Sequence, residues 1–162
     1  MPIIFLLLIL VLLIMLSGFL SGSETAITAT SKPRITWQTK KGNKRAIYVL
    51  KILNQKDNVI SSLLLSNNLV NILASSLATV FFYNIFGVEG IFYSTLIMTV
   101  VLVIFAEVLP KTYALNKPTR TALLISPFIY YLNKLLFIFV FLINKFVKIL
   151  VKNKDIDNKI RD

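Results

Sequence analysis

The sequence predicts an all-α integral membrane protein with three transmembrane helices and a juxtamembrane helical belt. Three observations support this prediction: the composition, four long apolar runs and the placement of the basic residues. Of the 162 residues, 56% are hydrophobic and 15% are charged, and the mean hydropathy is +0.77. Soluble domains are about 45–50% apolar and about 25% charged. The length suits one compact domain, and its excess of apolar residues lies in runs.

Each apolar run is long enough to cross a bilayer, which takes about 20 mostly apolar residues. The runs cover about residues 3–29, 59–86, 91–115 and 121–151. The first run resembles the core of a signal peptide, but no Lys or Arg precedes it, as a signal peptide requires. We therefore interpret it as a span.

Charge placement predicts the topology of the first three spans. The loop after the first span carries eight Lys and Arg residues, whereas residues 87–90 after the second span carry none. Positive charge favours the cytoplasmic side, so the first loop is expected inside and the N-terminus outside. We predict a transmembrane core over 1–120 with its cytoplasmic loop at 30–58. Interfacial helices over 121–152 and a cytoplasmic tail over 153–162 are expected to follow.

The fourth run fits an interfacial helix better than a fourth span. If it crossed, the bases of the tail would end outside, against the charge bias. Lys134, Lys145 and Lys148 interrupt it and suit a helix that lies on lipid headgroups. Pro118 and Pro127 are expected breaks in the helix. A fourth span is the alternative.

The cytoplasmic loop is expected to be partly ordered. Apolar residues over 46–53 predict a short amphipathic helix. Gly42 and Asn43 predict a turn before it. Asp57 or Asn58 is expected to cap the second span.

The residue types restrict the chemistry. The chain has no Cys and no His, so any bound metal must be held by oxygen, which suits magnesium, calcium or sodium. The net charge of +11 would fit a nucleic-acid binder, but the bases flank apolar runs. We expect no nucleic-acid partner. An enzyme is not expected either, because only Glu24 or Glu107 could act as acid or base and no nucleophile pairs with them.

Polar residues inside spans are functional candidates because they are costly there. The first span carries Ser17, Ser21, Ser23, Glu24 and Thr25, the second carries Ser66, Asn67, Asn68 and Asn71, and the third carries Glu107. At about 1.5 Å per residue, the three groups lie at a similar depth, a little inside the cytoplasmic half. Rows of residues four apart share a helix face. Glu107 is expected to point at both rows.

Other interpretations of these residues are purely structural. Gly18 and Gly22 have the spacing of a helix-packing motif, and span hydroxyls often bond their own backbone. The Asn residues can join helices, Glu107 can pair with Lys111, and Glu24 can act as a cap. Against this, Pro110 cannot bond the carbonyl of Ala106, and a freed carbonyl beside Glu107 suits a hard cation.

Three motifs resemble the CorC/cyclin M magnesium transporter family. They are Phe19-Leu20-Ser21-Gly22-Ser23-Glu24-Thr25-Ala26, Leu65-Ser66-Asn67-Asn68-Leu69-Val70-Asn71-Ile72 and Ala106-Glu107-Val108-Leu109-Pro110-Lys111. The resemblance covers nearly the whole chain, in order and with matching gaps. Two positions depart from it, since family members usually have Gly where Ser66 and Ala106 stand.

The resemblance implies a homodimeric domain of a bacterial inner (plasma) membrane, with the C-terminus in the cytoplasm. It implies magnesium export, with sodium entering in exchange. By motif position the magnesium ligands would be Ser21, Asn71, Glu107 and Asn67. Secondary candidates are Ser17, Ser23, Glu24, Asn68 and the Ala106 carbonyl. Gly18, Gly22, Pro110 and Lys111 would serve helix bending or gating. A cytosolic CBS-domain pair that binds ATP is expected downstream, so no ATP is expected on these residues.

Two other functions stay open from the sequence. One is a membrane-embedded magnesium sensor that does not move the ion. The other is a structural anchor that dimerises through Gly18 and Gly22.

Overall fold

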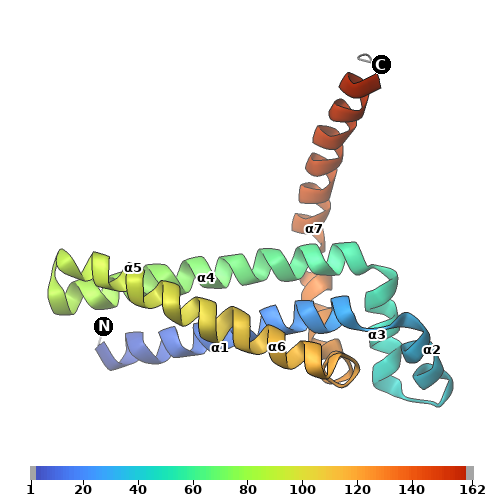
Figure 1. Cartoon of the computed structure of the whole chain (residues 1–162), viewed down its shortest axis with the longest axis horizontal. Helices are drawn as coiled ribbons and strands as arrows, with labels where there is room; N and C mark the ends of the chain where they lie inside the picture. The colour runs from blue at the N-terminus through green and yellow to red at the C-terminus, as the bar shows by residue number, and fades with distance from the viewer. Residues whose placement is uncertain (1–2, 160–162) are drawn as a thin grey trace.

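The computed structural model describes the backbone of residues 3–159 and the side chains of residues 3–142, 145 and 146. Every element in this part of the chain is a helix, which confirms the all-α prediction (Figure 1). The elements are α1 (Ile3–Ala29), α2 (Lys32–Lys40), α3 (Lys44–Asn54), α4 (Lys56–Phe86), α5 (Glu89–Val101), a π-helix η1 (Leu102–Val108), α6 (Leu109–Asn116) and α7 (Pro118–Lys159).

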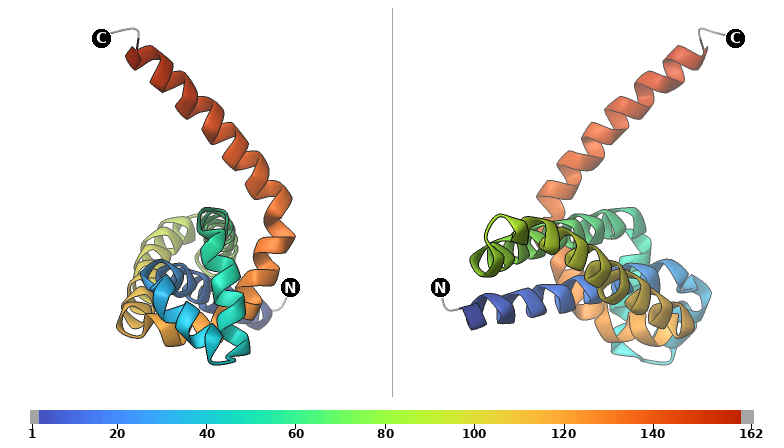
Figure 2. Two further views of the ribbon diagram at one scale, coloured as in Figure 1. Left: turned by 90° about the vertical axis from the view of Figure 1, so that its right-hand side faces the viewer. Right: turned by 60° about the vertical axis from the view of Figure 1, so that its left-hand side comes forward.

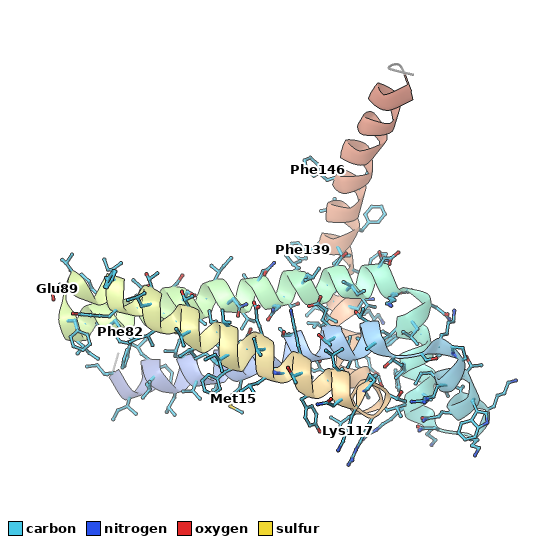
Figure 3. The ribbon with its side chains drawn as sticks, in the orientation of Figure 1. Met15, Phe82, Glu89, Lys117, Phe139 and Phe146 are labelled. Atoms are coloured by element: carbon cyan, nitrogen blue, oxygen red, sulfur yellow. The ribbon has the colours of Figure 1, made fainter. Side chains whose placement is uncertain are left out.

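Three long helical rods form the bundle. They are α1, α4 and the continuous run of α5, η1 and α6, and each is long and apolar enough to cross a membrane. They lie side by side in both views (Figures 1 and 2). Glu89 and Lys117 lie at opposite ends of the bundle (Figure 3). We call the end near Lys117, where the basic loop lies, the inner end, and the end near Glu89 the outer end.

The turn between α4 and α5 at the outer end is tight. Gly87 ends α4 with a φ of 63°, a conformation that favours glycine. Gly90 lies so close to α4 that a Cβ there would be 2.5 Å from the carbonyl carbon of Phe82 and nearer still to its oxygen. Only glycine fits this approach of one backbone to another.

The loop at the inner end folds into α2 and α3. Gly42, with a φ of 84°, makes the predicted turn, and Asn43 caps α3 by accepting from the Arg45 amide at 3.0 Å. The predicted amphipathic helix is present as α3, which buries Ala46, Val49 and Ile52.

The expected cap of the second span was wrong. Helix α4 begins at Lys56, and the residue before it, Gln55, makes no side-chain cap. Asp57 lies inside the first turn, where its negative carboxylate interacts favourably with the positive end of the helix dipole.

Helix α7 starts at Pro118 as expected, but it runs through Pro127 without a break, so the second predicted break was wrong. A proline inside a helix leaves the carbonyl four residues earlier without its backbone donor. Here the Ser126 hydroxyl donates to that carbonyl, of Leu123, at 3.2 Å. The serine thus supplies part of what the proline removes.

Helix α7 does not run parallel to the three rods. Its first half packs across the inner end and buries Ala122, Ile125 and Ile129. Its second half leaves the bundle at a steep angle (Figures 1 and 2). Residues Pro118–Leu142 are nevertheless long and apolar enough to span. Phe139 and Phe146 on the second half are exposed (Figure 3), while the side chains of Lys148 and of the tail lie outside the described residues.

Candidate metal site in the membrane core

Three side-chain oxygens meet where α1 crosses α4. The Ser17 hydroxyl lies 2.8 Å from Oδ1 of Asn67 and 2.5 Å from Oδ1 of Asn71. Ser17 is fully buried and Asn67 nearly so. A hydroxyl has one hydrogen to donate, so it cannot satisfy both amide oxygens at once. The cluster therefore brings a hydroxyl and two side-chain amides to one point, where each amide can present its oxygen.

The cluster lies near the middle of both helices. Ser17 is about 18 Å from the inner end of α1, and Asn71 is about 22 Å from either end of α4, at 1.5 Å per residue. From the sequence, Ser21 ranked above Ser17 and the expected level was closer to the cytoplasm. The structure instead joins Ser17 to the two Asn residues, which share a face as their four-residue spacing predicted.

Ser21 lies one turn further along α1 and is fully buried. Its hydroxyl is the one buried side-chain polar atom without a hydrogen-bond partner in the described part of the chain. Leaving a buried polar group unpaired costs about 1–3 kcal/mol. A bound cation that prefers oxygen ligands would give this unpaired hydroxyl a partner.

Other hydroxyl candidates on α1 bond their own helix. Ser23 donates to the Phe19 carbonyl at 2.6 Å, and Thr25 donates to the Ser21 carbonyl at 3.3 Å. These contacts match the structural interpretation of span hydroxyls. Glu24 is half-buried, and Asn68 is exposed on another face of α4. The structure does not bring these four residues into the cluster.

Gly18 and Gly22 let α1 pack closely on the third rod. A Cβ on Gly18 would lie 3.0 Å from the Phe105 carbonyl oxygen and 3.1 Å from Cγ of Pro110. A Cβ on Gly22 would lie 3.3 Å from Pro110. Within one chain, this glycine face is therefore occupied by η1 and α6. The apolar hollow beside Gly18, about 380 Å³ in volume, offers no oxygen side chain to an ion.

The third rod carries a π-helix at the candidate site. Over Leu102–Val108 the backbone bonds reach five residues back, as from the Leu109 amide to the Ile104 carbonyl. In this pattern the carbonyl that Pro110 fails to serve is that of Phe105, one residue before the Ala106 expected from α-helical geometry. The Phe105 carbonyl faces α1 at Gly18. A backbone oxygen is thus available at the contact between the two rods.

Glu107 does not reach the oxygen cluster. Its neighbour Ala106 is fully buried, whereas Glu107 itself is exposed on the surface of the rod. No described contact joins it to Ser17, Asn67 or Asn71, and it forms no ion pair with Lys111. The expectation that Glu107 points at both polar rows is therefore not met within one chain. Metal binding by these residues stays a prediction.

A second polar contact, between α4 and α7, was not predicted from the sequence. The Ser62 hydroxyl donates to Oδ1 of Asn133 at 2.7 Å, and both residues are buried. One turn up α4, Ser66 donates to the Ser62 carbonyl at 2.8 Å. Phe128 of α7 also packs edge-on against Phe19 of α1, with ring centroids 5.2 Å apart. Helix α7 thus contacts both helices of the cluster, and the signal was Asn133 inside an apolar run.

Comparison with known proteins agrees with this architecture. The family model described as the cyclin M transmembrane N-terminal domain matches residues 8–160. The chain belongs to the cyclin M transmembrane domain family. The resemblance found from the three motifs is thereby confirmed.

Curated relatives come from bacteria and a plant. A UPF0053 protein of Haemophilus influenzae is 35% identical over 151 residues, which cover 93% of this chain and 36% of the relative. The UPF0053 inner membrane protein YfjD of Escherichia coli is 38% identical over 137 residues, covering 85% and 32%. A putative chloroplastic DUF21 domain-containing protein of Arabidopsis thaliana is 29% identical over 115 residues, covering 71% and 17%. The chain spans about a third of the length of the two bacterial relatives.

Proposed function

We propose that this membrane domain moves magnesium across the bilayer through an oxygen-lined site between α1 and α4. The observation that carries the proposal is the meeting of Ser17, Asn67 and Asn71 at mid-depth, next to the orphan hydroxyl of Ser21. Magnesium prefers hard oxygen ligands, and a chain without Cys or His offers no softer ones. Polar groups are energetically costly at this depth, so their presence marks a functional candidate.

Glu107 would supply the charge. Among the described residues there is no group of three or more acidic side chains that could hold a metal, so the site is not a carboxylate cage. One carboxylate against two positive charges holds the ion loosely enough to release it. Glu107 is exposed on a predicted span, where contact of its carboxylate with lipid would be costly. A second copy of the chain packed against this face would shield it from lipid. We therefore place the working unit in a homodimer.

The π-helix offers a way to move Glu107 relative to the oxygen cluster. A π segment holds an extra residue, so converting it to α-helix turns one flank against the other by roughly 100°. Such a turn would carry Glu107 toward or away from α1 while Pro110 stays packed on Gly22. Alternating access would then be a shift between two states of the third rod.

Export coupled to sodium entry is the direction that we propose. Sodium is also a hard cation and can compete for the same neutral oxygens at modest cost. The steep angle of α7 and its packing across the inner end support three spans with an interfacial belt. That arrangement would put the N-terminus outside and the C-terminus in the cytoplasm of an inner membrane.

The test is magnesium flux in proteoliposomes under an inward sodium gradient. The variants are Ser17→Ala, Asn71→Ala and Glu107→Gln, with Asn68→Ala as the matched control on the exposed face of α4. We expect sodium-dependent flux in the wild type and in the control, and its loss in the other three. Flux that survives in all variants would contradict the proposed site. Magnesium binding by calorimetry with no wild-type flux would favour a sensor.

A further inference from the structure

The helical hairpin of α2 and α3 carries a strong and unbalanced charge. Residues 32–54 hold seven basic residues and no acidic one. All seven are exposed: Lys32, Arg34, Lys40, Lys41, Lys44, Arg45 and Lys51. Four of them lie within six residues around the turn at Gly42. None forms an ion pair with a carboxylate in the part of the chain that the structure describes.

This hairpin is held rigidly on the bundle. Ile35 of α2 and Ala46, Val49 and Ile52 of α3 are all buried in the inner core. Helix α3 also packs along α7 and α2. Charges on a fixed scaffold lose little freedom when they bind a partner, so the binding is stronger.

The position of the hairpin is that of the lipid headgroups. Helix α1 is about 40 Å long, whereas the hydrocarbon layer is about 30 Å thick and the whole bilayer about 40–45 Å. Helix α2 begins only three residues after α1 ends. The hairpin lies at the end of the bundle where α1 ends and α4 begins (Figures 1 and 2).

An exposed tryptophan lies within the charged surface. Trp37 is 56% exposed, and the Lys41 ammonium lies 3.7 Å from the centroid of its ring. Tryptophan is enriched at membrane interfaces because its ring is apolar and its N–H is polar. A cation held beside an interfacial indole places positive charge where a lipid phosphate would lie.

We propose that the α2–α3 hairpin is a binding surface for anionic phospholipid headgroups. The bases contact lipid phosphates, and Trp37 enters the boundary between headgroups and acyl chains. An acidic protein segment would also suit the charge. The level of the hairpin and the exposed indole favour lipid, since neither is needed for a partner in the cytosol.

The chain provides its own probe, because Trp37 is its single tryptophan. Bromine on lipid acyl chains quenches a nearby indole. The experiment measures Trp37 fluorescence in vesicles of phosphatidylcholine that contain increasing fractions of brominated phosphatidylglycerol or of brominated phosphatidylcholine. We expect the anionic lipid to bind at Trp37 at least about fivefold more strongly, since a single base near an anionic surface already provides that ratio. Added salt should reduce the preference.

A pair of triple variants separates local binding from net charge. The test variant is Lys40→Gln/Lys44→Gln/Arg45→Gln, which keeps Lys41 beside the indole. The control is Lys117→Gln/Arg120→Gln/Lys134→Gln, which removes the same charge from other exposed positions. We expect the preference to fall clearly in the first, which retains four of the seven bases of the hairpin, and to be kept in the second.

Three results would overturn the proposal. Equal quenching by the two lipids in the wild type would mean that the bases only orient the chain. Quenching by aqueous acrylamide but by neither lipid would place Trp37 in the cytosol, as an acidic protein partner would require. Equal loss in both triple variants would assign the preference to net charge. The readout does not involve magnesium, so it stands or falls independently of transport.

Discussion

The two ends of the bundle are packed in different ways. At the inner end, fourteen buried apolar residues from α1, α2, α3, α4, α6 and α7 form one core. At the outer end, the core is Leu10, Ala74, Ala78 and Met98, from α1, α4 and α5 alone. Burial of apolar surface between elements resists local opening. The oxygen cluster lies between the two cores, so we expect its outer side to open more readily than its inner side.

The largest expected effect is at the tightest point of the outer end. Gly90→Ala would place a Cβ 2.5 Å from the carbonyl carbon of Phe82 and 2.9 Å from the amide nitrogen of Tyr83, both backbone atoms. We expect the free energy of unfolding to fall by about 3 kcal/mol, at the upper end of overpacking costs. Thermal unfolding in detergent measures this.

Gly87→Ala is the control for that change. Gly87 has a φ of 63° and a ψ of −142°, and a Cβ added to it would have no atom within 4 Å, so only backbone strain of about 1–3 kcal/mol is expected. A smaller loss for Gly90→Ala than for Gly87→Ala would mean that the α4–α5 hairpin simply spreads, and that the outer end is looser than its helices suggest.

The next effect concerns the polar contact at the inner end. Ser62→Ala removes the described partner of the buried Asn133 side chain, and an unpaired buried amide costs about 1–3 kcal/mol. Asn133→Leu should cost less, about 1 kcal/mol, because the Ser62 hydroxyl still has the Asn58 carbonyl at 2.9 Å. Chemical unfolding of the two variants gives the order. The reverse order would show that Asn133 finds another partner.

A weaker polar contact holds the outer end. The Thr79 and Ser94 hydroxyls lie 3.1 Å apart, and Thr79 also donates to the Ser75 carbonyl at 2.9 Å. Ser94→Ala should therefore cost only about 0.6 kcal/mol, the average for such contacts between membrane helices. The same unfolding assay compares it with Ser62→Ala. Similar losses in the free energy of unfolding for Ser94→Ala and Ser62→Ala would mean that the two ends are held equally firmly.

No loss of stability is expected at the orphan hydroxyl of Ser21. Ser21→Ala breaks no described side-chain hydrogen bond and removes an unpaired buried hydroxyl, so the free energy of unfolding without magnesium should stay the same or rise, by at most about 1–3 kcal/mol. If Ser21 is a ligand, magnesium affinity measured by calorimetry should fall at least about tenfold, since a polar contact to an ion is worth about 1.5–3 kcal/mol. A clear loss of stability without magnesium would reveal a structural bond instead.

Hydropathy and four-residue spacing predicted much of this architecture. Apolar length indicated the rods, and the shared face of Asn67 and Asn71 follows from helix geometry alone. Ser17 and Ser21 share one face of α1, so the choice between them depends on the height at which α1 packs against its neighbours. The close contacts of Gly18 and Gly22 with the third rod belong to that packing, and no local pattern in the sequence records it.

The π-helix and the exposure of Glu107 were also beyond the sequence. One proline is compatible with an α-helix, a kink or a π segment, and the difference depends on the neighbouring rod. The same limit applies at Pro127, where the preceding serine preserves the helix. A proline predicts that the backbone pattern is disturbed, but the form of the disturbance is a tertiary property.

The hydroxyl of Ser126 has one hydrogen and two carbonyls within reach. Besides Leu123 in its own helix, it lies 3.3 Å from the Arg45 carbonyl of α3. The hydroxyl can donate to only one of these carbonyls at a time. The bend of α7 at Pro127 and the contact of α7 with the basic hairpin therefore share one hydrogen bond, so a change in either is expected to alter the other.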